Sequence, residues 1–474
     1  MSLTRKIAHN TLYQIIGRGG GGILAVVGIA FITRYLGREG FGIYTTITAF
    51  LMFFGIVVNF GITTITVQMI SERDDGISKL MSNIFTLRLI SSAFFLSLAP
   101  IASLFFPYPT IIKVGIAITS FAFLFQMLTE TIIGIFQKYL QMHKPAMAEF
   151  FSRIVFVILI VLFVYLKYGI LSMMVVLNIA NFIWFAITFY FARKLVKFGF
   201  AFDWDVWREV LRRSWPIGLS IILNLIYLKT DVLILSVLKN QEAVGLYGAP
   251  YKLIDAVTTF AMMFMGLILP LLAASWVKQN MERFEKIFQK TLAGLIVVIV
   301  PMVVGVYFIG TKIMVMVAGK EFAESGIILS ILILGAGALF IGSLFAHTIV
   351  ALDKQKMILW GYAVDAAISL VLYFIFIPKY SYIGAAWVTV FSEVMIALVG
   401  VWVIYRVTGI LPKFFKIFAK SLLAAAPMAA ALYFLQDLHV VFLMMIAMVV
   451  YGIFIILFKG VSVKEIGEVI KLKS

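Results

Sequence analysis

Four ionisable side chains stand inside two successive apolar segments near the middle of the chain, namely Lys229, Asp231, Lys252 and Asp255. A charged group inside such a segment is costly unless it is paired or lines water, so it marks a site of function. Lys252 and Asp255 are three residues apart on one helix face and can neutralise each other. Lys229 and Asp231 are two residues apart and point in different directions, so each needs another partner.

Oxygen-bearing side chains on three apolar segments suggest a site for a small hard cation such as sodium. Asp231, Asp365 and Thr389 supply the carboxylate and hydroxyl ligands that such a cation prefers. The alternative is that both aspartates accept hydrogen bonds from protein donors. Asp365 has no basic neighbour in its own segment, so burial would also favour its protonated form.

The first half of the chain carries further ionisable residues in apolar segments. Arg18 stands within a run of glycines, which predicts a tight packing seam between helices or a bend beside a cavity. Arg88 and Glu130 fall at similar depth in consecutive segments and suggest a structural ion pair. Glu149 and Arg153 are four residues apart on one helix face and suggest a local pair.

The segments that must position these residues are long and apolar throughout. Of the 474 residues, 63% are hydrophobic and only 13% are charged. Predominantly apolar stretches, each long enough to cross about 30 Å of hydrocarbon, recur about fourteen times. Short alternating segments typical of a membrane barrel do not occur. We therefore predict an all-α polytopic membrane protein with about fourteen transmembrane helices.

A repeated motif divides the chain into two related halves. The sequence RYLGREGFGIY of residues 34–44 returns faintly as LKNQEAVGLY of residues 238–247. Three identities stand at one constant separation: Glu39 with Glu242, Gly42 with Gly245, and Tyr44 with Tyr247. Each copy follows the first apolar segment of its half, and the dipeptide Lys-Tyr at 167–168 and 379–380 is a second, looser anchor. Two pseudo-symmetric six-helix lobes are the predicted arrangement.

Four parts follow from this division. The N-terminal lobe covers residues 1–192, an amphipathic cytoplasmic linker covers 193–213, and the C-terminal lobe covers 214–407. The linker contains two tryptophans, Trp204 and Trp207, together with arginine and lysine, which is typical of a helix lying on a membrane surface. Residues 408–474 form two further helices and a basic tail without counterpart in the first half.

The net charge of +17 has a topological explanation. With the N-terminus in the cytoplasm, lysine and arginine are about three times as frequent in cytoplasmic as in external connections, as the positive-inside rule requires. Both termini are therefore predicted to be cytoplasmic. Attraction to anionic lipid is a secondary effect of the basic residues, and no nucleic-acid partner is expected.

Motifs of catalysis are missing. The chain has no cysteine, no phosphate-binding GxxxxGK[ST] loop, no HExxH and no serine elbow. The predicted external connections are too short to carry the acidic residues of a membrane glycosyltransferase or polymerase, which stays a remote alternative. We therefore expect no enzyme and no cofactor beyond a coupling ion, sodium or a proton.

Three stretches together resemble a known family. RYLGREGFGIY, YLKTDVLIL at 227–235 and LYGAPYKL at 246–253 resemble the polysaccharide transporter family, which includes the Wzx-type oligosaccharide-lipid flippases. That family belongs to the MOP superfamily together with the MATE exporters and the lipid II flippase MurJ. The resemblance covers essentially the whole chain.

The resemblance implies a flippase that moves a lipid-(pyro)phosphate-linked oligosaccharide from the cytoplasmic to the outer leaflet. Transport would proceed by alternating access, driven by an ion gradient or the membrane potential, in a monomer in a prokaryotic cell membrane. The implied head-group ligands are Arg18, Lys229, Lys252 and Arg88, and the implied sodium ligands are Asp231, Asp365 and Thr389. A cation-coupled multidrug or small-lipid exporter of the MATE type is the alternative, although such an exporter would favour acidic cavity residues.

Overall fold

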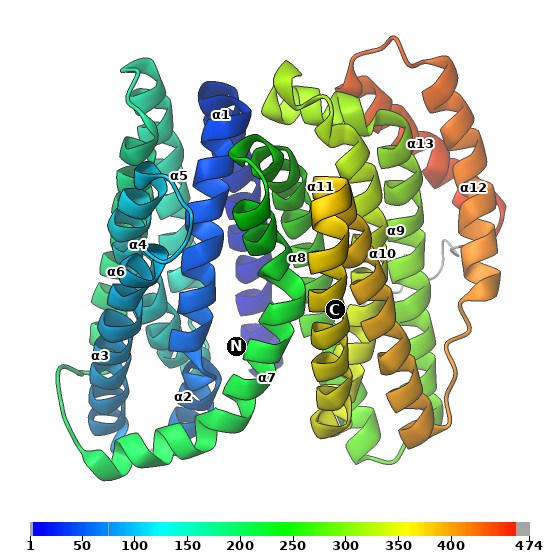
Figure 1. Ribbon diagram of the computed structural model, residues 1–474. Coiled ribbons are helices and arrows are strands. Elements are labelled where there is room, and N and C mark those ends of the chain that lie inside the picture. Colours follow the sequence, from blue (N-terminus) through cyan, green and yellow to red (C-terminus); the bar gives the residue numbers. More distant parts are fainter. Residues whose placement is uncertain (1–2, 74, 461–474) are drawn as a thin grey trace. The chain divides into compact units, whose positions relative to one another are not determined.

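The computed structural model describes the backbone of residues 3–73 and 75–460 (Figure 1). Side chains are described over the same ranges except residues 3–19, 220 and 223–228, so Arg18 lies outside the described side chains. The described residues are helical and contain no strand. They confirm the predicted all-α class.

The chain divides into two compact units, residues 1–248 and 249–474. The first unit contains α1 (Leu3–Asn59), α2 (Ile62–Ser71), α3 (Ile77–Ser103), α4 (Thr110–Lys138), α5 (His143–Tyr165), α6 (Ile170–Leu195), α7 (Trp204–Leu238) and the start of α8 (Gln241–Val277). The second unit contains the rest of α8, α9 (Met281–Ala318), the short η1 (Lys320–Phe322), α10 (Ser325–Ala351), α11 (Gln355–Thr408), α12 (Phe415–Phe434) and α13 (Val440–Leu457).

Two of these helices are broken inside. Helix α1 has 57 residues and a non-helical residue at Gly37, whose φ is 65°. Helix α11 has 54 residues and a non-helical residue at Ser381, whose φ is 50°. A continuous helix of either length would measure about 80 Å, more than twice the hydrocarbon thickness, so each one supplies two crossings. Gly37 lies inside the predicted bend at residues 34–44.

The number of crossings agrees with the prediction. Within the described residues, eleven helical stretches are long and apolar enough to cross a membrane, and two of them, of 52 and 54 residues, include the breaks just described. Counting these twice and adding α7 accounts for the predicted fourteen. The chain is therefore a multi-pass membrane protein.

The two copies of the repeated motif meet each other inside the first unit. A Cβ atom added to Gly42 would lie 1.7 Å from the carbonyl oxygen of Gln241, and one added to Gly245 would lie 2.0 Å from that of Arg38. Arg38 and Gln241 stand at the same separation in the chain as the two glycines. Each copy therefore contacts the other through the same positions, which is the reciprocity of a two-fold contact. The crossing supports two pseudo-symmetric repeats.

The glycine run at the start of α1 packs against α5. A Cβ atom on Gly20 would lie 3.0 Å from the ring of Phe150, and one on Gly28, two turns further, would lie 2.6 Å from the ring of Phe156. Small residues let two helices approach closely. The predicted packing seam is thus present between α1 and α5.

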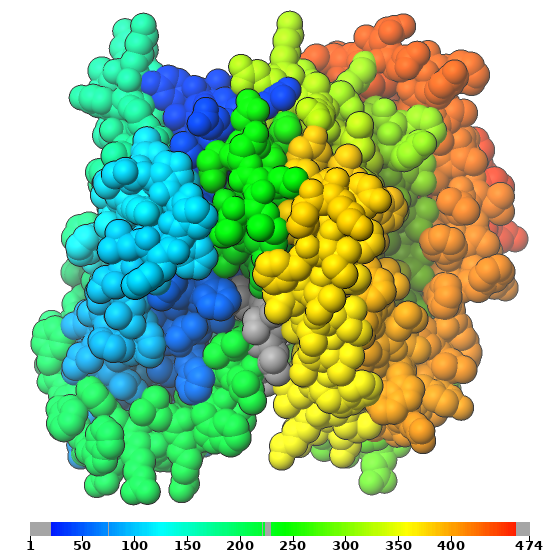
Figure 2. All heavy atoms as spheres, viewed as in Figure 1, coloured from blue at the N-terminus to red at the C-terminus, as the bar shows by residue number. Residues whose placement is uncertain are grey.

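The predicted surface linker runs directly into a long helix. After an extended connection, α7 begins at Trp204 and continues without a break past Pro216, and its start covers the lower end of the first unit in Figure 2. Arg213 joins Glu72 and Glu209 at 2.8 Å each. The hydrogen bond from Arg213 lowers the pKa of the Glu72 carboxyl. The pair with Glu72 holds the start of α7 against the end of α2, whereas the pair with Glu209 lies within α7.

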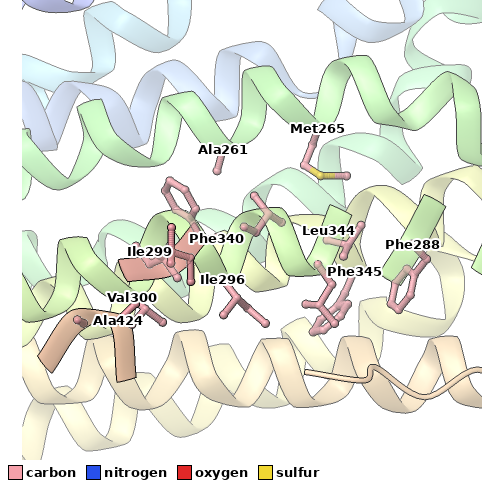
Figure 3. Packing of buried hydrophobic residues seen from close by; sticks show 14 of the residues in the cluster. Ala261, Met265, Phe288, Ile296, Ile299, Val300, Phe340, Leu344, Phe345 and Ala424 are labelled. Atoms are coloured by element: carbon pink, nitrogen blue, oxygen red, sulfur yellow. The ribbon is translucent and has the colours of Figure 1, made fainter. Parts of the chain in front are cut away.

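The second unit is built around a large apolar core (Figure 3). Its buried side chains come from α8, α9, α10, α11, α12 and α13, and include Ala261, Met265, Ile296, Val300, Phe340, Leu344 and Ala424. The predicted additional helices α12 and α13 pack on α9 and on each other. Helix α10 has the largest buried share among the described candidate spans.

Adding one methyl group at the motif crossing should destabilise the protein. In Gly42→Ala the new Cβ would overlap the Gln241 carbonyl, and overpacking of this kind typically costs about 1–3 kcal/mol. Thermal unfolding in detergent should show a lower Tm. The matched control is Gly22→Ala in the same helix, where a Cβ meets nothing within 4 Å. That variant should be neutral or slightly more stable, and equal Tm values for the two variants would contradict the crossing.

Candidate functional site

Asp231 is fully buried in α7 and is held by protein donors. The Tyr247 hydroxyl donates to Oδ2 at 2.5 Å, and the backbone N–H of Val232 donates to Oδ1 at 2.7 Å. Tyr247 is the repeated tyrosine of the second motif copy, and it too is fully buried. The motif therefore fixes the orientation of the aspartate carboxylate.

The two lysines of the candidate site lie in different helices and different units. Lys229 is partly buried in α7, two residues before Asp231. Lys252 is partly buried in α8, in residues 249–474. Both therefore stand inside the helical segments that the sequence placed within the membrane.

The break in α11 brings two predicted ion ligands onto facing helical segments. Asp365 is fully buried in the first segment and accepts hydrogen bonds from Ser392 at 2.6 Å and Ser369 at 3.4 Å. Thr389, one turn before Ser392, lies 3.1 Å from the Tyr373 hydroxyl. One carboxylate and several hydroxyl oxygens thus line the same helix pair.

The donor set of this helix pair fits a small hard cation in its chemistry. Sodium prefers oxygen ligands, and Asp365, Ser392 and Thr389 offer only oxygen atoms. Among the described residues, no cluster of three or more histidine, cysteine, aspartate or glutamate side chains could hold a metal. A cation here would depend on one carboxylate with hydroxyl groups.

Arg88 is fully buried in α3, and its hydrogen-bond partners among the described residues are all neutral groups. Its Nε donates to the Thr131 hydroxyl at 2.7 Å, and its two terminal nitrogens donate to the Val58 carbonyl and the Thr63 hydroxyl, also at 2.7 Å. Asn59 accepts a longer bond of 3.5 Å. Arg88 thereby ties α3 to α4, to the end of α1 and to the start of α2.

The predicted pair of Arg88 with Glu130 is not a direct contact. The Glu130 carboxylate accepts a hydrogen bond from Gln126 at 3.0 Å, one turn earlier on α4. The predicted pair of Glu149 and Arg153 on α5 is present, with a charge separation of 4.0 Å. Sequence spacing sufficed for the local pair, whereas the partners of Arg88 depend on how four segments pack.

A polar cavity of about 310 Å³ lies inside the first unit, among α1, α4, α5 and α6. Its polar lining includes Gln126, Glu149, Arg153 and Asn181. Of this lining, the sequence patterns pointed to the α5 pair and to Tyr44, the repeated tyrosine of the first motif copy. The missed signal is the spacing on α6, where Leu177, Asn181 and Trp184 recur on one helix face and all line the cavity.

Removing the Arg88 guanidinium should destabilise the first unit. Arg88→Met keeps the length of the side chain but leaves buried acceptors without donors, which we expect to cost about 2–4 kcal/mol. Thermal unfolding in detergent measures the loss. The control is Arg193→Met, since Arg193 is exposed on α6 and makes only a ring contact with Phe189. A change within about 0.5 kcal/mol is expected there, and a similarly small change for Arg88→Met would contradict its structural role.

Two protein relatives are similar to this chain in sequence. The putative O-antigen transporter of Shigella dysenteriae is 23% identical over 397 residues, covering 82% of this chain and 98% of the relative. The capsular polysaccharide biosynthesis protein CapF of Staphylococcus aureus is 26% identical over 206 residues, and the match spans only half of CapF and 42% of this chain.

Solved structures share the fold. The lipid II flippase MurJ in an inward closed conformation matches with a TM-score of 0.78 at 19% identity, covering 94% of this chain and 98% of that structure. An inward-facing multidrug resistance MATE transporter of the MOP superfamily matches with a TM-score of 0.63 at 13% identity. The match covers 84% of this chain and 95% of that structure. The family model described as polysaccharide biosynthesis protein matches residues 7–276, which is more than half of the chain. The chain therefore belongs to the polysaccharide biosynthesis protein family, and its fold is similar to those of MurJ and the MATE transporter.

Proposed function

We propose that this protein is a flippase that moves a lipid-(pyro)phosphate-linked oligosaccharide from the cytoplasmic to the outer leaflet. The observation that carries the proposal is membership of a polysaccharide biosynthesis family combined with a nearly full-length match in fold to a lipid II flippase. The similarity to a putative O-antigen transporter over almost the whole of that relative supports the same substrate class.

The physical task explains the buried charges. A phosphate group and a sugar chain have no partners in hydrocarbon, so their passage needs polar and cationic groups inside the helical segments. We propose Arg18, Lys229 and Lys252 as ligands of the anionic head group. The sequence predicted the same role for Arg88. That role stays a prediction, and the Arg88 side chain already makes four hydrogen bonds to protein groups.

We further propose that an ion gradient or the membrane potential drives the cycle. The candidate ion ligands are Asp231, Asp365 and Thr389, with sodium or a proton as the coupling ion. When bound, sodium would supply positive charge among the oxygen atoms of Asp365 and Thr389 and so stabilise the pairing of the two α11 segments. We propose a monomer with both termini in the cytoplasm, in a prokaryotic cell membrane.

Two other functions are weighed against this one. The MATE-like fold also suits a cation-coupled drug or small-lipid exporter, and the match to a MATE transporter supports that alternative. A membrane glycosyltransferase is less compatible with the structure. Among the described residues, the connections between helices are short, and the longest runs only from residue 196 to 203. We therefore propose transport without a catalytic role.

Neutralising the candidate head-group lysines should abolish glycan export. Lys229→Gln and Lys252→Gln remove the positive charge, so export of the lipid-linked oligosaccharide should fall at least about tenfold, the effect of about 1.4 kcal/mol. The measurement is complementation in a cell whose surface glycan depends on this protein. Lys356→Gln, at an exposed lysine near the start of α11, is the control and should export normally. Normal export by both lysine variants would refute their role, and export of a cationic dye in place of glycan would favour the exporter.

Sodium should stabilise the parent protein if the ion site exists. A bound ion raises the free energy of unfolding by about 2.7 kcal/mol at one hundred times its dissociation constant. The Tm in detergent should therefore rise with sodium but not with choline, and Asp365→Asn should lose the rise. Asp353→Asn, at an exposed aspartate before α11, should keep it. Equal Tm values of the parent in sodium and choline would remove sodium from the proposal and leave the proton.

A further inference from the structure

The cavity of the first unit lies at mid-depth of its helices. Arg153 stands about 15 Å along α5 from the helix start, half the thickness of the hydrocarbon. The side chains of Arg153 and Glu149 are still 37% and 25% exposed. Charges at that depth do not face lipid, because hydrocarbon offers them no partners. The cavity of about 310 Å³ that these side chains line is therefore open to water.

One lining residue has an unused hydrogen-bond donor. The Nε1 atom of Trp184 on α6 is buried and has no partner among the described residues. A buried donor without a partner costs about 1–3 kcal/mol, and a bound molecule or water can recover that cost. Asn181, one turn earlier, donates its own amide to the Leu177 carbonyl at 2.9 Å, which leaves its side-chain oxygen to accept.

The charges of the lining limit the kind of ligand. Glu149 and Arg153 are 4.0 Å apart, too far for a direct hydrogen bond, so each retains hydrogen-bonding capacity. Together they are neutral. A free anion would lie beside the Glu149 carboxylate and a free cation beside the Arg153 guanidinium. A neutral molecule with several hydroxyl groups can bond to both at once.

The remaining lining suits a ring with one apolar face. Phe123, Ala122 and Leu177 form the apolar part of the wall. A volume of about 310 Å³ is at the small end of ligand pockets, which typically measure about 300–1,000 Å³. The space therefore accommodates one saccharide ring and not an oligosaccharide chain.

We propose that this cavity is a saccharide subsite, which binds one neutral sugar unit. Trp184 Nε1 and the Arg153 guanidinium donate to sugar hydroxyl groups, Asn181 and Glu149 accept from them, and Phe123 packs on the apolar face of the ring. The proposal rests on the flippase function for its biological source of sugar, the glycan of the lipid-linked substrate. It adds a site for the glycan inside the first unit.

The absence of native cysteine allows a direct test. Leu177→Cys places one thiol on the cavity wall without removing a hydrogen-bonding group. In the purified full-length protein, a small charged thiosulfonate should label this cysteine, and D-galactose or N-acetyl-D-glucosamine should protect it. At about ten times the dissociation constant of the sugar, labelling should slow about tenfold, since about one site in ten stays empty.

Two controls isolate the site. Phe200→Cys, in the exposed connection before α7, should label at a rate that sugars do not change. Adding Trp184→Phe to the Leu177→Cys protein removes the donor but keeps an aromatic ring, so protection should weaken at least about threefold, the effect of about 0.6 kcal/mol. Adding Trp402→Phe, at an exposed tryptophan of the second unit, should leave protection unchanged.

Three results would overturn the proposal. If the cysteine of the folded Leu177→Cys protein stays unlabelled, water does not reach the cavity. Labelling without protection by either sugar means that the cavity holds water only. Stronger protection by sodium acetate than by the sugars means an anion site. The assay uses free sugars and no transport, so a failure of glycan export with intact protection removes the flippase function and leaves the saccharide subsite standing.

Discussion

A polar group inside a transmembrane helix must have a protein partner or water, and this constraint determines the interior of the first unit. Arg88 meets it with four neutral acceptors from three helices, α1, α2 and α4. Asp231 meets it with a tyrosine hydroxyl and a backbone N–H. Trp184 and the α5 ion pair meet it only in part, and they are the groups that line a cavity. At this cavity, an unsatisfied donor and open space occur together.

The same constraint separates structural from ligand-binding charges. Arg88 makes four hydrogen bonds with its five N–H donors inside the protein, so it has little to offer a phosphate without giving up those bonds. Arg153, which is 37% exposed beside a carboxylate at 4.0 Å, keeps donors for another molecule. In the second unit, Asp365 falls between these two cases. The hydroxyl groups of Ser392 and Ser369 donate to its carboxylate, and each hydroxyl can rotate so that its oxygen binds a cation instead.

Much of the fold could be predicted from the sequence, since membrane crossings follow from apolar length alone. The bend near Gly37 was marked by its polar residues, and the ion pair on α5 by its spacing. The break at Ser381 follows directly on the Lys-Tyr pair at 379–380, where polar residues again separate two apolar segments. The partners of Arg88 and the cavity around Trp184 depend on the packing of several helices, which no single segment encodes. The surface linker was predicted as a separate part, yet its helix continues into α7, because Pro216 is tolerated inside the helix.

The reciprocal crossing of the two motif copies has an evolutionary consequence. A Cβ on Gly248 would lie 2.7 Å from the Thr45 side chain, and these two residues again stand at the repeat separation. After an ancestral duplication, a larger side chain at Gly42 or Gly245 would collide with the backbone of the other copy. Substitution of either glycine would therefore be selected against. Elsewhere the halves were free to diverge. This history explains why so few identities survive between them, and why those that do include the pair in backbone contact.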